Sequence, residues 1–457
     1  MTKLVSTNPW DNSVVGEVEL MEEDEVTQIV LKSHIAQKAW KQQTLQERIK
    51  ILTHSYESFK LRKEEIALLL AREMGMPYMQ ALDEVQYGFM YWKWYLANAE
   101  KYLSPEITKE TEKELHKVYY EPKWVVVAIA PWNYPFSMFV WTSIQALLWG
   151  NTIIFKTSKE TCITWKKIEE IMRASGVPDW VFLEVYGDGH VGDILAHQDI
   201  DFITFTGSTP VGKHLYWLAA EKMIWCVMEL WGSAPGIVLE DAQIDTVLGS
   251  LYFLRFSNCW QMCDGLKRLI VHTSRYDELV EKLKILLESK KIGLAEDAHT
   301  DIGPMVSESQ LVHLEAQVQD AIDKGASILA ENIPNENLMG SYHSAMILWN
   351  ITKDMLVWRE EVFGPVLPII TFNTLEEAIE LANETEYGLW GYIFTQDREV
   401  FEEIALQIES GEIQHNNLNY CIPESPFGGY KASGIGREHG HWGFHEFCNV
   451  KVLSIEK

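Results

Sequence analysis

The sequence predicts an α/β protein with two large domains. Its 457 residues exceed the roughly 250–300 residues at which a single hydrophobic core stops growing. After a helical stretch from Glu22 to about Lys101, short β-branched runs alternate with amphipathic helices. Such alternation is typical of a parallel sheet with helices on both faces. Because no repeat or low-complexity linker interrupts the chain, we place the boundary between the domains at Glu229, on functional grounds.

The first alternation predicts a helix-covered sheet between residues 116 and 222. The runs "HKVYYEP" and "WVVVAIAPW" are expected to be strands joined by a tight turn at Pro122 and Lys123. Two further expected strands, "NTIIFKT" and "DFITFTGS", each precede a helical pattern, which covers 159–176 and 209–222.

A second alternation follows Glu229 and predicts the second α/β domain. Its expected strands are 235–240, 267–273, 366–372, 392–395 and 412–417, and its expected helices are 245–258, 276–289 and 375–383.

Composition excludes several function classes. A formal net charge of −27 disfavours nucleic acid and anionic lipid as partners. The start "MTKLVSTNPW" lacks a signal core, and the most apolar run, 135–150, is too short and too often interrupted to span a bilayer. The six cysteines show no zinc-type spacing. We therefore expect a cytoplasmic protein with reduced thiols, no metal and no membrane association.

Two loops at strand ends are candidates for binding chemistry. "FTGSTPVG" (205–212) passes through Gly207 and Ser208 into a helix, whose N-terminus would hold a pyrophosphate through backbone N–H groups. The alternative is a simple N-cap. Asn133, in "APWNYP", would donate to a developing oxyanion; the alternative is an ordinary turn residue.

Two side chains are candidates for bond-making chemistry. Glu229 follows an apolar strand, so it is either a desolvated general base or an exposed strand-end residue. Cys263, in "SNCWQMCDG", is a nucleophile if a helix N-terminus or a nearby base activates its thiol. Otherwise it is a small hydrophobic core residue.

Together these stretches resemble the aldehyde dehydrogenase superfamily, from "STNP" near residue 6 to "GFHEFCNVKV" near residue 452. The family's motifs occur in order: PWN at 131–133, a lysine at 156, F-T-G-S-x-x-x-G at 205–212, E-L-G-G as "ELWG" from 229, N-x-G-Q-x-C as "NCWQMC" up to 263, E-E-x-F-G-P at 360–365, and P-F-G-G-x-K-x-S-G at 426–434.

The resemblance implies a covalent mechanism. Cys263 would attack an aldehyde, and Asn133 with the Cys263 backbone N–H would hold the thiohemiacetal oxyanion. Hydride transfer to a nicotinamide would leave a thioester, and Glu229 would activate the water that hydrolyses it.

The resemblance also implies a nicotinamide cofactor site. Its expected residues are Lys156 and Glu361 at the ribose hydroxyls, Phe363 near the nicotinamide, and Gly207 with Ser208 at the pyrophosphate. Trp132 is a further expected cofactor-binding residue. Many NAD-using relatives have a glutamate three positions after the lysine, where this chain has Lys159, beside Ser158. An ammonium there would attract a 2′-phosphate, so we expect NADP, with NAD as the alternative.

The resemblance implies three parts. We expect a Rossmann-like cofactor domain (1–113 and 129–228), an α/β catalytic domain (229–415) and a small β oligomerisation flap (114–128 and 440–457). The exposed edge strands of this flap would aggregate unless a second subunit paired with them, so we expect a homodimer or homotetramer. The C-terminal segment is most similar to the succinate-semialdehyde dehydrogenase branch, which makes succinate semialdehyde the expected substrate; lactaldehyde and medium-chain aldehydes are the alternatives.

Tryptophan replaces glycine at two motif positions. Trp260 stands where the family has the glycine of G-Q-x-C, and Trp231 where it has the first glycine after the catalytic glutamate. An added indole buries about 200 Å² at positions where backbone and nicotinamide approach closely. Two functions therefore remain open: an active NAD(P)-dependent aldehyde dehydrogenase, or a catalytically impaired protein of the same fold that retains nucleotide binding.

Overall fold

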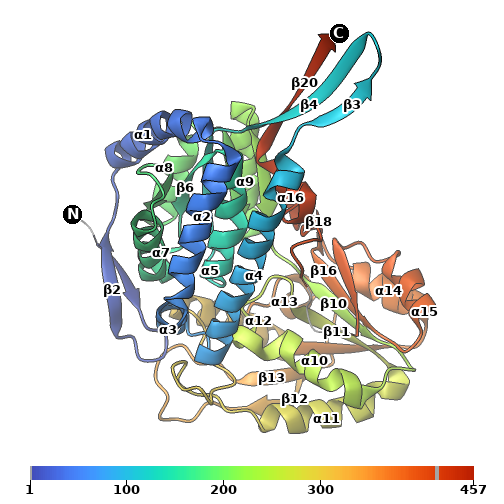
Figure 1. Ribbon diagram of the computed structural model, residues 1–457. Helices are drawn as coiled ribbons and strands as arrows, with labels where there is room; N and C mark the ends of the chain where they lie inside the picture. Colours follow the sequence, from blue (N-terminus) through green and yellow to red (C-terminus); the bar gives the residue numbers. More distant parts are fainter. Residues whose placement is uncertain (1–2, 417–420) are drawn as a thin grey trace.

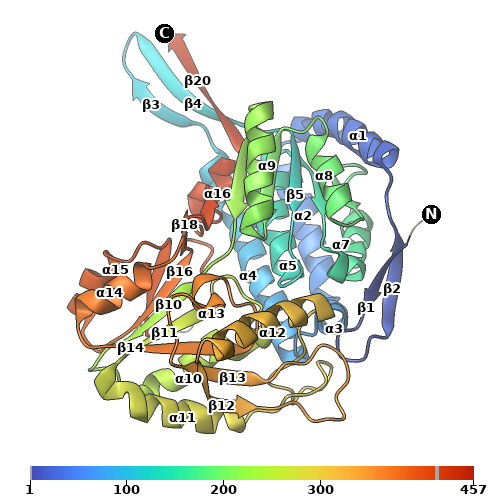
Figure 2. The same ribbon diagram turned by 180° about the vertical axis from the view of Figure 1, so that it is seen from behind.

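The computed structural model describes residues 3–416 and 421–457. Two α/β bodies lie against each other, and a three-stranded sheet projects from one of them (Figures 1 and 2). The α/β architecture predicted from the sequence is confirmed. In the part of the chain that the structure describes, no helix has the length and apolar character needed to cross a membrane.

The first body is built on a six-stranded sheet. Its strand order is β19-β9-β8-β5-β6-β7, parallel except for β19. The strands are β5 (Val125–Ile129), β6 (Thr152–Lys156), β7 (Phe182–Val185), β8 (Phe202–Thr206), β9 (Trp225–Glu229) and β19 (Gly434–Ile435).

Helices cover both faces of this sheet because its central strands are apolar on both sides. Val126 and Ala128 pack into the core under the long helices, whereas Val125 and Val127 face a second core. The helices are α1 (Glu23–Gln42), α2 (Leu45–Lys60), α3 (Lys63–Met74), α4 (Tyr78–Leu103), α5 (Pro135–Phe139), α6 (Gln145–Trp149), α7 (Cys162–Ala174), α8 (Gly189–His197) and α9 (Thr209–Lys222).

The second body is built on a seven-stranded sheet of order β12-β13-β14-β11-β10-β16-β17, in which only β12 runs antiparallel to its neighbour. The strands are β10 (Ala234–Val238), β11 (Leu266–His272), β12 (Ser327–Asn332), β13 (Ala345–Trp349), β14 (Val366–Phe372), β16 (Trp390–Phe394) and β17 (Glu412–His415). Its helices are α10 (Ile244–Phe256), α11 (Tyr276–Glu288), α12 (Glu308–Asp323), α13 (Leu356–Arg359), α14 (Leu375–Asn383) and α15 (Arg398–Ala405).

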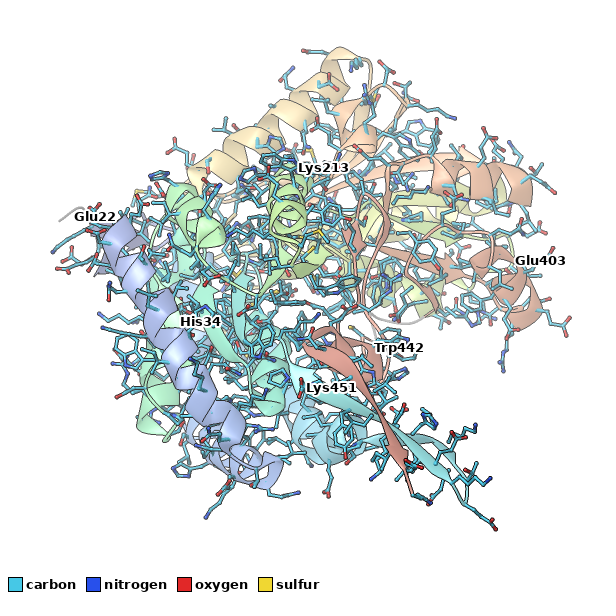
Figure 3. The ribbon with its side chains drawn as sticks, turned by 90° about the horizontal axis from the view of Figure 1, so that it is seen from above. Glu22, His34, Lys213, Glu403, Trp442 and Lys451 are labelled. Atoms are coloured by element: carbon cyan, nitrogen blue, oxygen red, sulfur yellow. The ribbon has the colours of Figure 1, made fainter. Side chains whose placement is uncertain are left out.

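The projecting sheet has the order β20-β4-β3 and consists of β3 (Glu106–Glu110), β4 (Glu114–Pro122) and β20 (Cys448–Glu456). Figure 3 shows Lys451 on β20, with Trp442 of α16 (Gly440–Glu446) nearer the body. Residues 114–122 of the expected flap pair with the C-terminal strand. Residues 125–128, which the expected flap also includes, lie in the centre of the six-stranded sheet.

After β4 the chain changes direction sharply at Trp124, whose φ is 90°, and enters β5. Val125 to Ala128 are fully apolar and buried, as a strand covered on both faces requires. The two predicted strands on either side of Pro122 therefore exist but belong to different sheets. A hairpin of β1 (Lys3–Thr7) and β2 (Val14–Glu19) was not predicted.

Candidate active site

A cleft of about 580 Å³ lies where the two bodies meet. The three expected catalytic residues, Asn133, Glu229 and Cys263, all line it. So do five of the expected cofactor residues: Trp132, Gly207, Ser208, Glu361 and Phe363. Lys156, Ser158 and Lys159 lie at and after the end of β6, outside this lining.

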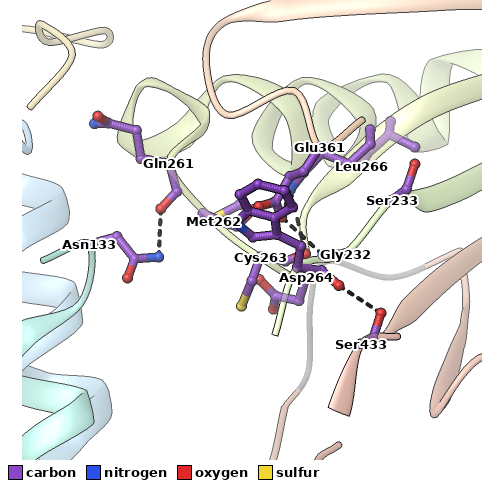
Figure 4. Close-up of polar contacts among 12 residues, drawn as sticks. Asn133, Gly232, Ser233, Gln261, Met262, Cys263, Asp264, Leu266, Glu361 and Ser433 are labelled. Carbon is purple, nitrogen blue, oxygen red and sulfur yellow. Dashed lines mark hydrogen bonds and ion pairs between the residues drawn. The ribbon is translucent and has the colours of Figure 1, made fainter. Parts of the chain in front are cut away.

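Cys263 lies in the loop between the 3₁₀ turn Ser257–Trp260 and β11. Its side chain is half-buried, and Figure 4 shows the sulfur on the side facing Asn133. Burial, followed by the neighbouring carboxylates of Asp264 and Glu361, raises the pKa of the thiol well above its usual value. Lys267 acts in the opposite direction. The thiol is therefore protonated at neutral pH unless a base or cation acts on it.

Asn133 is fixed by the loop that contains Cys263. Its side-chain nitrogen donates to the Gln261 carbonyl at 2.9 Å (Figure 4), and its carbonyl accepts from the Asn258 side chain at 3.2 Å. Because an amide nitrogen carries two protons, one remains for a substrate oxygen. The Asn133 side chain thus positions the loop and still presents a donor to the cleft.

Glu229 is the last residue of β9 and is 3% exposed. Within the described part of the chain, neither carboxylate oxygen has a hydrogen-bond partner. Burial, with a smaller contribution from Glu438, raises the pKa of Glu229 well above its usual value, and Arg437 opposes this shift. An unpartnered carboxylate with a raised pKa, facing a cleft, has the properties of a general base. The alternative of an exposed strand-end glutamate is wrong.

Glu361 has a partner that the sequence analysis missed. Its Oε1 accepts from the Gly232 N–H at 3.1 Å and lies 3.6 Å from Nζ of Lys267. Burial raises the pKa of Glu361 to about 7, and Lys267 partly offsets that shift. The only signal in the sequence was a lysine inside the apolar strand "LKRLIVH".

Lys156 ends β6 and is 6% exposed. Burial lowers its pKa to about 8, against the raising effect of Glu160, Asp188 and Glu184.

Glu160 also contacts Ser158 and Lys159, the two residues expected to lie near the 2′-phosphate of NADP. It accepts from the Ser158 hydroxyl, and its Oε1 lies 3.9 Å from Nζ of the exposed Lys159. This end of the site therefore combines a cation with a carboxylate that the sequence analysis did not consider.

The turn at Gly207 and Ser208 leads into α9 as predicted. The Gly207 N–H donates to the Glu229 carbonyl at 2.9 Å, which joins this turn to the end of β9. Ser208 is the N-cap residue of α9, yet its side chain makes no capping hydrogen bond. The N-terminal N–H groups and the Ser208 hydroxyl therefore fit an anionic ligand better than they fit a closed N-cap.

Trp260 is accommodated away from the cleft. It has a left-handed φ of 62°, is fully buried and does not belong to the cleft lining. Its indole ring contacts two cations, with Arg255 Cζ at 4.1 Å and Lys267 Nζ at 4.9 Å from the ring centroid. A Cβ on Gly265 would lie 2.2 Å from the ring, so that glycine provides the space. The indole thus replaces solvent around two buried charges.

Trp231 behaves differently because it lines the cleft. Its ring packs edge-to-face on Tyr387 at 6.4 Å, and its carbonyl accepts from the Ser433 hydroxyl at 2.7 Å. On the same cleft, Trp132 and Phe363 form an edge-to-face pair at 5.5 Å. Of the two indoles at family glycine positions, Trp231 is the one that restricts the cleft.

We predict that Trp260→Ala destabilises the protein by about 3–5 kcal/mol, because it opens a cavity and exposes two buried cations to it. It should leave the Kd of the nicotinamide nucleotide unchanged. Trp231→Ala should lower that Kd roughly fivefold or more, because overpacking costs about 1–3 kcal/mol. Thermal unfolding and nucleotide titration separate the two effects. Weaker nucleotide binding by Trp260→Ala without loss of stability would contradict this assignment.

Comparisons with known proteins agree with this geometry. The Aldehyde dehydrogenase family profile matches residues 2–453. A succinate-semialdehyde dehydrogenase of Oryza sativa subsp. japonica mitochondria is 32% identical over 450 residues, which cover 98% of this chain and 85% of the relative. A peroxisomal aminoaldehyde dehydrogenase of Pisum sativum is 33% identical over 463 residues, which cover 99% and 92%.

The fold also matches solved structures. A structure of 3,6-anhydro-L-galactose dehydrogenase in complex with NAP superimposes with a TM-score of 0.95 at 30% identity, covering 99% of this chain and 95% of the other. The match of the profile to nearly the whole chain settles the family: this protein belongs to the aldehyde dehydrogenase family, whose members are NAD(P)-dependent oxidoreductases.

Proposed function

We propose that this protein oxidises an aldehyde to the carboxylic acid, with NADP as the preferred cofactor and Cys263 as the nucleophile. The observation that carries the proposal is that Cys263, Glu229 and Asn133 line one cleft together with the expected cofactor residues. The nucleotide would lie along the α9 N-terminus, Glu361 and the Trp132–Phe363 pair. When bound, it supplies the acceptor for the substrate's hydride.

In the first half of the reaction Cys263 is the nucleophile and Asn133 stabilises the oxyanion. The thiolate attacks the aldehyde carbon, which forms a C–S bond and places a negative charge on the substrate oxygen. The free N–H of the Asn133 amide and the Cys263 backbone N–H stabilise that charge. Removing one such donor typically raises the barrier by about 3 kcal/mol.

Glu229 acts in the second half. Loss of the hydride from the substrate carbon converts the thiohemiacetal into a thioester on Cys263. The unpartnered Glu229 carboxylate takes a proton from a water molecule, and the resulting hydroxide attacks the thioester carbon. The C–S bond then breaks, which releases the carboxylic acid and returns the Cys263 thiolate.

The substrate has two candidates. Succinate semialdehyde is favoured by the C-terminal likeness and by the relatives that act on it. A second candidate, an aldehyde with a cationic tail, is favoured by the cleft itself: Asp83, Glu84 and Asp264 line it, and its described lining contains no lysine or arginine. A carboxylate tail would find no opposite charge among these residues.

Turnover should depend on both catalytic groups. Cys263→Ala should reduce NADPH formation by roughly a thousandfold or more on any accepted aldehyde. Glu229→Gln should release NADPH once per site and then stall, because the thioester forms but is not hydrolysed. A panel containing succinate semialdehyde and an ω-aminoaldehyde would select the substrate class. Steady turnover by Cys263→Ala would contradict the proposal.

The raised pKa values of Cys263 and Glu229 determine the direction in which turnover changes with pH. Both groups act without their protons, and burial raises both pKa values. We therefore expect kcat/KM to rise with pH through neutrality and to fall as acid protonates Cys263, and kcat to fall also as acid protonates Glu229. If no aldehyde is turned over at any pH while NADP still raises the melting temperature, the impaired alternative, with Trp231 blocking the chemistry, would be correct.

Cofactor preference should depend on Lys159. Lys159→Ala should raise the Kd for NADP about tenfold, because a charge-assisted contact with the 2′-phosphate is lost, and should leave NAD binding unchanged. Lys166→Ala, an exposed lysine on α7, is the matched control. Equal losses for NAD and NADP would mean that Lys159 does not select the cofactor.

We also propose a homodimer or homotetramer assembled through the projecting sheet. Its strand β20 is an edge, and Val450 and Val452 are 65% and 61% exposed. An uncovered apolar edge promotes association. Val450→Asp with Val452→Asp should yield monomers in sedimentation experiments, whereas Ile35→Asp on α1 should not. A monomeric wild-type protein would refute this proposal.

A further inference from the structure

Lys267 is a buried cation that lies behind the cleft lining, next to the loop of Cys263. It is the second residue of β11, and its side chain is 1% exposed. Its ammonium lies 3.6 Å from Glu361 Oε1, donates to the Met262 carbonyl, and lies 3.4 Å from the Cys263 carbonyl. A buried ammonium is tolerated only when paired and hydrogen-bonded, and these contacts meet that condition.

Two aromatic rings complete its surroundings. Nζ lies 4.9 Å from the centroid of the Trp260 ring and 5.5 Å from that of Phe363. Arg255 lies over the same Trp260 ring but directs its hydrogen bonds to the carbonyls of Leu266 and Gly364. Lys267 is thus the cation that contacts the nucleophile's backbone, whereas Arg255 holds neighbouring segments.

The charges acting on Cys263 are otherwise negative. Asp264, Glu361 and Glu229 all disfavour the thiolate, and Lys267 favours it. Burial lowers the pKa of Lys267, and Arg255 adds to that shift, whereas Glu361, Cys263 and Asp264 favour its charged form. Loss of the Lys267 charge would leave the thiolate among carboxylates alone.

We propose that Lys267 is a positioning residue for the nucleophile: it holds the loop of Cys263 through the Met262 and Cys263 carbonyls, favours the thiolate by its charge, and joins this loop to Glu361 of the nucleotide site. The inference rests on the proposed function in taking Cys263 as the nucleophile. It adds a residue that the mechanism above does not use.

The test is the rate of Cys263 alkylation by iodoacetamide as a function of pH, followed by peptide mass spectrometry without nucleotide or aldehyde. Lys267→Gln keeps a donor for the carbonyls but removes the charge. We expect Cys263 of this variant to be alkylated about tenfold more slowly than wild-type Cys263 below the midpoint, which is the pH of half-maximal rate, and equally fast at high pH. The reason is that an opposite charge at this range shifts such a midpoint by about one pH unit or more. Lys267→Arg should restore the wild-type midpoint.

The matched control is Lys290→Gln. Lys290 also lies over an aromatic ring, that of Tyr252 at 4.7 Å, and pairs with Asp301, but it does not line the cleft. Its profile should equal that of the wild type. If Lys267→Gln does not fold, Lys267→Gln combined with Glu361→Gln leaves neither charge buried alone, and its midpoint should lie above that of Glu361→Gln.

The outcomes separate this inference from the proposed function. An unchanged midpoint in Lys267→Gln, or an equal shift in Lys267→Arg, would overturn the role of Lys267 while leaving Cys263 reactive. A wild-type Cys263 that is not alkylated at any pH would instead overturn the proposed nucleophile.

Discussion

The active site depends on the hydrogen bonds of a single buried serine, Ser433. The Leu230 N–H donates to its carbonyl at 2.8 Å, its hydroxyl donates to the Trp231 carbonyl at 2.7 Å, and that hydroxyl accepts from the Gly388 N–H at 2.9 Å. The next residue, Gly434, pairs with Glu229 as β19 joins the six-stranded sheet. These contacts fix the point at which the chain passes from one body to the other, and thereby place Glu229 in the cleft.

A second constraint is the burial of charged side chains behind Cys263. Arg255, Lys267 and Glu361 all lie out of water beside a loop that contains three successive left-handed residues, Asn258 to Trp260. Such a loop stores strain and persists only when its surroundings determine it. The indole of Trp260 packs against both cations, so its presence at a family glycine position is consistent with an intact fold. The replacement of glycine at 231 has no comparable structural compensation.

Much of this arrangement was predictable from the sequence. The alternation of strands and helices specified the α/β class, and ordered motifs identified residues that the fold brings into one cleft, such as Asn133 and Cys263. Lys267 and Glu160 were missed because their roles arise from tertiary neighbours, which no spacing in the chain indicates. The placement of residues 125–128 was missed because an apolar run specifies a strand but does not specify its sheet.

The most direct test of the account is to locate the covalent intermediate. The protein is mixed with NADP and an accepted aldehyde, quenched in acid within the first turnover, and digested for mass spectrometry. The account predicts that the acyl group of the substrate is attached to the peptide containing Cys263, and to no other cysteine. An acyl group on Cys259 or Cys421, or NADPH formation with no acylated peptide, would contradict it.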